Sequence, residues 1–135
     1  MIPATRTSLF RGRDLFDAGA FFEAHEVWEE AWLVEEGTTR LLLQGLIQVA
    51  AAFHKISRAD PPSGAARLLD AGLRKLADVP SDAAGGLRLG AFREAVERWR
   101  EASWGRGVGS GHPPGIEARP RLGPAEGEPA PTSGA

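Results

Sequence analysis

The chain has 135 residues, of which 42% are hydrophobic and 25% charged, with a formal net charge of -2 at pH 7, a composition that fits one globular domain with an adequate core. It contains no cysteine, so disulfides and thiolate metal sites are excluded, and a cytoplasmic location is expected. The scattered Lys and Arg residues argue against nucleic-acid binding, and the absence of a signal-peptide run or of a membrane-length apolar segment argues against export and membrane insertion.

The first expected helix covers about residues 7–18. Apolar side chains recur in it at three- and four-residue spacing, as in an amphipathic helix; they are Leu9, Phe10, Leu15 and Phe16. Gly19 suits its C-terminal end. Because the next helix follows at once, the two are expected to form a tight helical hairpin.

The second expected helix, residues 21–36, interleaves aromatic and acidic residues around one histidine. At a helical rotation of about 100° per residue, one arc carries Phe21, His25, Trp28, Glu29 and Trp32. The opposite side carries Glu23, Glu26 and Glu30. This acidic pattern is typical of a face exposed to solvent. His25 and Glu29 are four residues apart and can touch, so a polar pair is predicted inside an aromatic arc.

The third expected helix, residues 39–58, is apolar nearly all round and is therefore expected at the centre of the domain. One of its faces is small and polar, and comprises Gln44, Gly45, Gln48, Ala51 and Ala52. Small residues accept a bulky ridge from a neighbouring helix. We therefore expect helix 21–36 to lie on this face, where His25 and Glu29 would meet Gln44 and Gln48 and where the Trp28 and Trp32 indoles would find acceptors.

Two more helices are expected before the composition changes. One starts at Ser63 or Gly64 and stops before Pro80, and the other covers about residues 87–103. Residues 105–135 contain eight glycines and six prolines, too few apolar groups to offset ordering entropy. The prediction is one all-α domain over residues 1–104, a bundle of about five helices around one central apolar helix, with a disordered C-terminal tail over residues 105–135, in which His112 is solvated.

These motifs resemble a known family. The run from Phe22 to Trp32, the Gln44-Gly45-Leu46-Ile47-Gln48 segment with Ala51 and His54, and Gly64-Ala65 before a leucine-rich helix are together similar to the uncharacterised bacterial and archaeal helical proteins catalogued as domain of unknown function 309. The resemblance covers about residues 9–76. It implies an all-α domain with one central helix and no established activity. Its signature, which begins with a His-Glu-x-x-Glu motif, falls on His25, Glu26, Glu29, Trp32, Gln44, Gly45, Gln48 and His54.

Two functional hypotheses follow. In the first, the cluster of His25, Glu26, Trp28, Glu29, Trp32, Gln44, Gln48 and His54 is a buried structural network, or a site that binds a small molecule or a protein partner, with homodimerisation as a variant. In the second, His25 and Glu29 hold a divalent metal in a hydrolase, with His54 as a candidate third ligand. The glutamines and His54 lie roughly 80 to 120° apart around their helix, so both cannot face the motif squarely.

Overall fold

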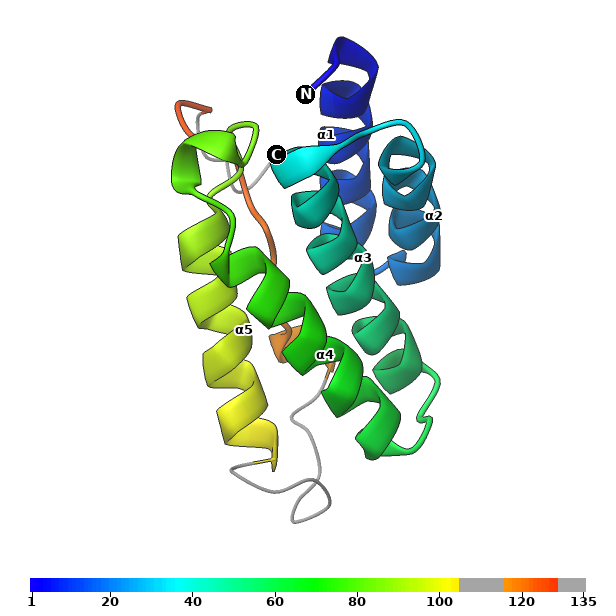
Figure 1. Cartoon of the computed structure of the whole chain (residues 1–135). Helices are drawn as coiled ribbons and strands as arrows, with labels where there is room; N and C mark the ends of the chain where they lie inside the picture. The colour runs from blue at the N-terminus through cyan, green and yellow to red at the C-terminus, as the bar shows by residue number, and fades with distance from the viewer. Residues whose placement is uncertain (105–115, 129–135) are drawn as a thin grey trace, which may run out of the picture.

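The structure, a computed structural model, describes residues 1–104 and 116–128, and in this part the chain is helical without a strand. Its elements are α1 (Pro3–Asp17), α2 (Phe21–Trp32), α3 (Gly37–Ser57), α4 (Pro62–Ala77), η1 (Ser81–Ala83), α5 (Leu89–Trp104) and η2 (Ile116–Ala118). Successive helices run up and down, and α3 lies between α2 and α4 (Figure 1). The predicted all-α bundle of five helices is confirmed.

Prolines and glycines set several of the helix ends. α1 begins at Pro3, earlier than the predicted Thr7, and α4 begins at Pro62. Proline suits the first helical position, because its missing N–H would have no intrahelical partner there. Gly19 follows α1 with φ +87°, a left-handed conformation that glycine adopts without strain, so the predicted stop at this residue is confirmed.

α2 ends at Trp32, four residues before the predicted end. The chain then turns through exposed Leu33 and Val34 to Glu35, which is only 8% exposed. The Glu35 carboxylate accepts the backbone N–H of Ile2 at 2.8 Å. The Thr5 hydroxyl and this N–H stabilise the carboxylate and lower the pKa of Glu35. A buried acceptor thus ties the α2–α3 loop to the start of α1.

α3 supplies the centre of the core, as its apolar sequence predicts. Its fully buried side chains are Leu42, Leu43, Leu46, Val49, Ala50, Ala52 and Phe53. Phe53 packs edge-on against Phe16 of α1 and lies 5.1 Å from the ring of Trp99 in α5, centroid to centroid. Rings from α1, α3 and α5 therefore meet in one aromatic cluster.

The small, polar face of α3 packs against α4, so the predicted seating of α2 on it is wrong for Gly45 and Gln48. A Cβ on Gly45 would lie 2.7 Å from the Leu76 side chain and 3.2 Å from the Gly72 carbonyl oxygen. The Gln48 amide oxygen accepts a hydrogen bond from Lys75 at 2.9 Å. Facing glycines let the α3 and α4 backbones approach closely, a complementarity that α2, which has no glycine, cannot offer.

α2 packs on another face of α3. Phe21 stacks near Phe53 at 5.7 Å between centroids, and Phe22 lies 5.4 Å from His54. Of the predicted contact face, Ala51 does lie beside α2, where it lines a cleft with Phe22. α2 is thus adjacent to α3 as predicted, but it packs on the face of α3 that carries His54.

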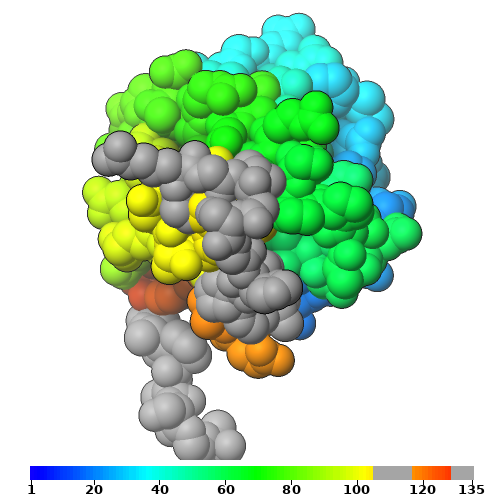
Figure 2. Space-filling model, turned by 90° about the horizontal axis from the view of Figure 1, so that it is seen from below, coloured from blue at the N-terminus to red at the C-terminus, as the bar shows by residue number. Residues whose placement is uncertain are grey.

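The predicted tail is only partly within the described residues, since 105–115 and 129–135 lie outside them. Residues 116–128, here called the C-terminal strap, return along α1 and α5 (Figure 1) and reach the surface beside α5 (Figure 2). Leu122 in the strap is 4% exposed and joins the core. Disorder was predicted from the small number of apolar residues, whereas residues 116–128 are also held by backbone hydrogen bonds.

We expect Gly72→Ala to destabilise the domain. Its Cβ would lie 2.8 Å from the Gly45 carbonyl oxygen and 2.9 Å from a Val49 methyl, so two helix backbones must separate, at a cost of about 1 to 3 kcal/mol. Gly90→Ala is the matched control, because nothing lies within 4 Å of its Cβ and alanine favours a helix by up to about 1 kcal/mol. Urea unfolding of both variants checks this; equal stabilities would contradict the close crossing.

The lowered pKa of Glu35 predicts an acid-sensitive contribution to stability. The contribution is present above the ordinary carboxyl pKa and is lost as the pH falls through the lowered pKa in the folded state. Wild type should therefore exceed Glu35→Gln in unfolding free energy near neutral pH, and the difference should shrink towards about pH 3. Urea unfolding across this range measures it, with exposed Glu30→Gln as the control. A difference independent of pH would contradict the assignment.

Candidate functional site

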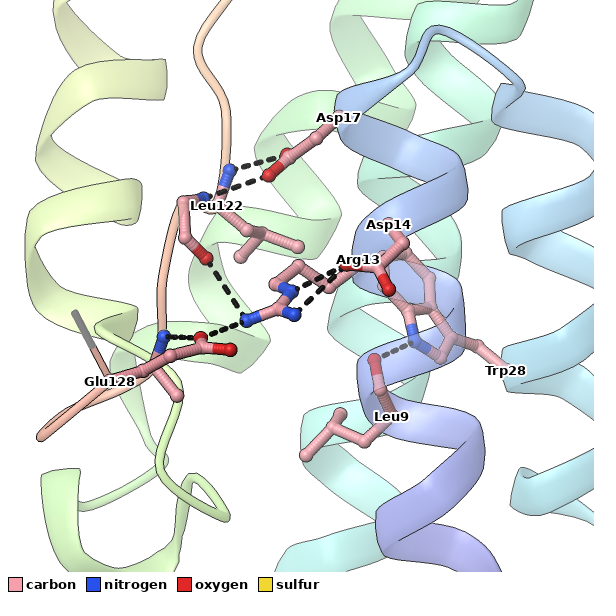
Figure 3. Close-up of polar contacts among 9 residues, drawn as sticks. Leu9, Arg13, Asp14, Asp17, Trp28, Leu122 and Glu128 are labelled. Atoms are coloured by element: carbon pink, nitrogen blue, oxygen red, sulfur yellow. Dashed lines mark hydrogen bonds and ion pairs between the residues drawn. The ribbon is translucent and has the colours of Figure 1, made fainter. Parts of the chain in front are cut away.

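Trp28 anchors α2 on α1. Its side chain is fully buried, and its indole N–H donates to the Leu9 carbonyl oxygen at 3.1 Å (Figure 3). Gly12 makes the space for this ring, because a Cβ there would lie 2.1 Å from the indole nitrogen. The predicted acceptor on α3 is therefore wrong for Trp28, whose partner is a backbone carbonyl of α1.

Trp32 joins the end of α2 to the start of α3. The guanidinium carbon of Arg40 lies 3.9 Å from the Trp32 ring centroid, within cation–π range. The Trp32 indole nitrogen is buried and has no hydrogen-bond partner in the part of the chain that the structure describes, so the acceptor predicted for it is not found there. Both tryptophans of α2 thus make packing contacts of the fold.

His25 and Glu29 touch each other, as their spacing predicts, but they are not enclosed. The His25 Nε2 and Glu29 Oε2 atoms are 3.3 Å apart, and the side chains are 27% and 52% exposed. Glu26 is exposed together with Glu23 and Glu30, so the acidic face is solvated as predicted. A half-exposed pair of this kind contributes little to stability. The pair therefore lacks the burial that a structural network needs.

The two glutamines lie away from this pair. Gln48 is bonded to α4 through Lys75, and Gln44 is partly buried outside the cleft beside α2. His54 takes the position predicted for the glutamines: its ring lies 5.4 Å from that of Phe22, which in turn lies 5.9 Å from that of His25. The predicted meeting of His25 and Glu29 with Gln44 and Gln48 is therefore not observed.

These rings border an open cleft between α2 and the end of α3, here called the α2–α3 cleft. Its volume is about 210 Å³, and it is lined by Phe22, His25, Ala51, His54, Lys55, Arg58 and Asp60. Phe22 is 46% exposed, unusual for a large aromatic side chain. Arg58 and Asp60 form a long ion pair of 3.9 Å. The cleft thus combines an accessible aromatic ring, two imidazoles, two cations and one carboxylate.

Sequence reasoning found two of these cleft residues, His25 and His54, and missed Phe22, Lys55, Arg58 and Asp60. The available signal was the helical spacing of Phe22 to His25 and of His54 to Arg58, which places each pair on one face. That signal identifies the cleft only when the α3 face that meets α2 is known. Periodicity shows which residues share a face of a helix, but it does not show which helix packs on that face. The polar face with the two glutamines was therefore predicted to contact α2.

The described residues contain no group of three His, Asp or Glu side chains that could hold a metal ion. His25 and Glu29 supply two ligands, whereas a catalytic zinc normally takes three from the protein. The metal-dependent hydrolase hypothesis therefore gains no support from this part of the chain. Within the same residues, every helix is too short or too polar to cross a bilayer.

Substitutions should separate the packing residues of α2 from its surface residues. Trp28→Phe leaves a cavity over Gly12 and removes the donor to Leu9, so we expect a loss of about 2 to 4 kcal/mol. Glu29→Ala breaks only a half-exposed pair and should cost less than about 1 kcal/mol. Urea unfolding of the two variants measures both values. A larger loss for Glu29→Ala than for Trp28→Phe would show that the pair is structural after all.

Comparison with known proteins agrees with the predicted resemblance. Residues 9–68 match the sequence profile of the family described as Domain of unknown function (DUF309). An uncharacterized protein of Aquifex aeolicus (strain VF5) is 34% identical over 83 residues, which are 61% of this chain and 24% of that protein. The chain thus spans about a quarter of the length of this relative. Over residues 9–68, within the α1–α4 region, the chain is thus similar to DUF309 domains.

Proposed function

We propose that the domain binds a small, planar, anionic molecule in the α2–α3 cleft. The observation that carries the proposal is the position of Phe22, whose exposed ring lies between two imidazoles and beside two cationic side chains. Small-molecule sites are concave, largely apolar and equipped with a few polar groups that fix orientation. The cleft has this composition.

The charges of the cleft favour an anion. Lys55 has no ion-pair or hydrogen-bond partner among the described residues, and its stem lies 3.8 Å from the position of a Cβ on Gly64. Arg58 is 64% exposed, and its pair with Asp60 is at the long limit for an ion pair. Two cations thus face one carboxylate. Charge-assisted hydrogen bonds to a carboxylate or phosphate are stronger than neutral ones.

The aromatic and imidazole rings favour a planar ligand. The Phe22 and His25 rings are stacked at an interplanar angle of 25°, and offset stacking extends readily to a further ring. The His54 imidazole makes no hydrogen bond within the described residues and is open to one from a ligand. Lys55 lies next to His54 in the last turn of α3, so ring and charge can be recognised together.

The volume limits the size of the ligand. Pockets for drug-sized molecules measure about 300 to 1,000 Å³, whereas this cleft measures about 210 Å³. A compound with one ring and one anionic group, such as benzoate, suits this space. Larger ligands would extend into solvent past Arg58, whose side chain is mostly exposed.

Nuclear magnetic resonance titration with benzoate tests the proposal. We expect amide shifts confined to residues around the cleft, and little response to benzyl alcohol, which has the ring without the charge. Lys55→Met keeps the stem and removes the charge, so it should weaken benzoate binding about tenfold or more. Arg67→Met removes a cation from the exposed surface of α4 and is the matched control.

Phe22→Ala should weaken benzoate as strongly as Lys55→Met, because it removes the stacking surface. Shifts that are equal for benzoate and benzyl alcohol would reject the anionic class. An absence of shifts at the cleft with both compounds, at millimolar concentration, would reject the cleft as the binding site.

A further inference from the structure

Asp17, the last residue of α1, receives the C-terminal strap by its backbone. The two carboxylate oxygens of Asp17 accept the N–H groups of consecutive strap residues, Leu122 at 2.7 Å and Gly123 at 2.9 Å (Figure 3). The Leu122 side chain is 4% exposed and belongs to the main core cluster. One carboxylate therefore fixes the direction of the strap, and one leucine fixes its register.

Side-chain contacts lie on both sides of the two hydrogen bonds to the Asp17 carboxylate. Arg119 donates to the Asp17 carbonyl oxygen at 2.9 Å, and its guanidinium carbon lies 5.5 Å from the Phe21 ring centroid. On the other side, Arg13 donates to the Glu128 carboxylate at 2.7 Å and to the Gly123 carbonyl oxygen at 3.4 Å. The groove between α1 and α5 that holds the strap thus offers a ring for an arginine, an acceptor for backbone N–H groups and a cation for a carboxylate.

A backbone contact at the far end completes the alignment. The Glu126 N–H donates to the Gly86 carbonyl oxygen at 2.7 Å, in the turn before α5. Gly86 has φ +99°, a backbone conformation that other residues rarely adopt. The strap is therefore held at α1 and at the α5 turn, with its own backbone supplying much of the recognition.

These contacts have the form of peptide recognition, in which main-chain hydrogen bonds give affinity and pockets for particular side chains give specificity. We propose that the groove between α1 and α5 is a peptide-binding site, that the strap occupies it within the chain, and that its external ligand is an extended segment of another protein with the pattern Arg-x-x-Leu-Gly. The pattern is that of Arg119, Leu122 and Gly123 in this sequence.

The strap is suited to exchange with such a partner. Leu122 is its large apolar side chain that the structure describes as buried, while several of its hydrogen bonds are part-buried or exposed to water. The strap is joined to α5 through residues 105–115, which include five glycines and two prolines. Because the strap belongs to the same chain, it competes with an external peptide as an intramolecular ligand. A free peptide therefore competes only when the strap is released, which makes binding conditional.

The test uses the full chain with Leu122→Asp, which places a charge at a buried position and so releases the strap. The probe is a fluorescein-labelled synthetic peptide of residues 116–128, with binding followed by fluorescence anisotropy. We expect this variant to bind the peptide at least tenfold more tightly than wild type does, because the wild-type groove is filled. The same peptide carrying Leu122→Asp is the matched control and should not bind.

Adding Asp17→Ala to the Leu122→Asp chain should abolish binding, since the acceptor for the two backbone N–H groups is gone. Circular dichroism confirms that each chain is folded. Equal affinity of wild type and Leu122→Asp for the peptide, or no binding to the folded Leu122→Asp chain, would overturn the proposal.

Hydrogen exchange on the wild type gives a readout that does not depend on a variant. The amides of Leu122 and Gly123 should exchange at least tenfold faster than those of buried α3 residues such as Leu46, because strap opening does not require global unfolding. Exchange of both sets at the same rate would show that the strap is a fixed part of the bundle, and the groove would then have no external ligand.

Discussion

The Phe16 ring is the contact on which the arrangement of the helices depends. It is fully buried, and its centroid lies within 6.1 Å of rings from α2, α3 and α5, which are Phe21, Trp28, Phe53 and Phe92. Edge-to-face aromatic pairs of this kind add specificity beyond the area that they bury. Because one side chain of α1 contacts three other helices, the position of α1 is set by the centre of the core, and the groups at its end are set with it.

The side chains of α2 divide between two tasks. Trp28 faces inward and fits the space above Gly12, so its shape is constrained by packing, since cores are close-packed. His25 faces the α2–α3 cleft, while Glu29 lies at the water boundary. A motif that resembles a metal-binding helix in spacing is here spread over different environments, and spacing on one helix does not bring ligands together without a third group from another element.

Much of the fold follows from hydrophobic periodicity, which predicted five helices and the central position of α3. The pairing of faces could not be predicted, because it depends on complementarity between distant residues: Gly45 fits α4 because Gly72 faces it. The position of the strap could not be predicted either, because the Asp17 carboxylate accepts backbone N–H groups. Every residue except proline has such a group, so composition does not indicate the contact. His25 was identified from its setting among aromatic residues, whereas the cationic part of the cleft needed the correct face of α3.

The α1–α2 turn connects the two proposed sites. Asp17 accepts the strap, Arg119 of the strap lies over Phe21, and Phe22 is the next residue along the chain and forms the aromatic wall of the cleft. Phe21 is itself fixed by Phe16, so the turn is held from the core side. A ligand in the cleft can shift the strap only by the difference in its affinity for the strap-bound and strap-free states. Any such coupling is reciprocal, so a peptide in the groove would change the affinity of the cleft by the same factor.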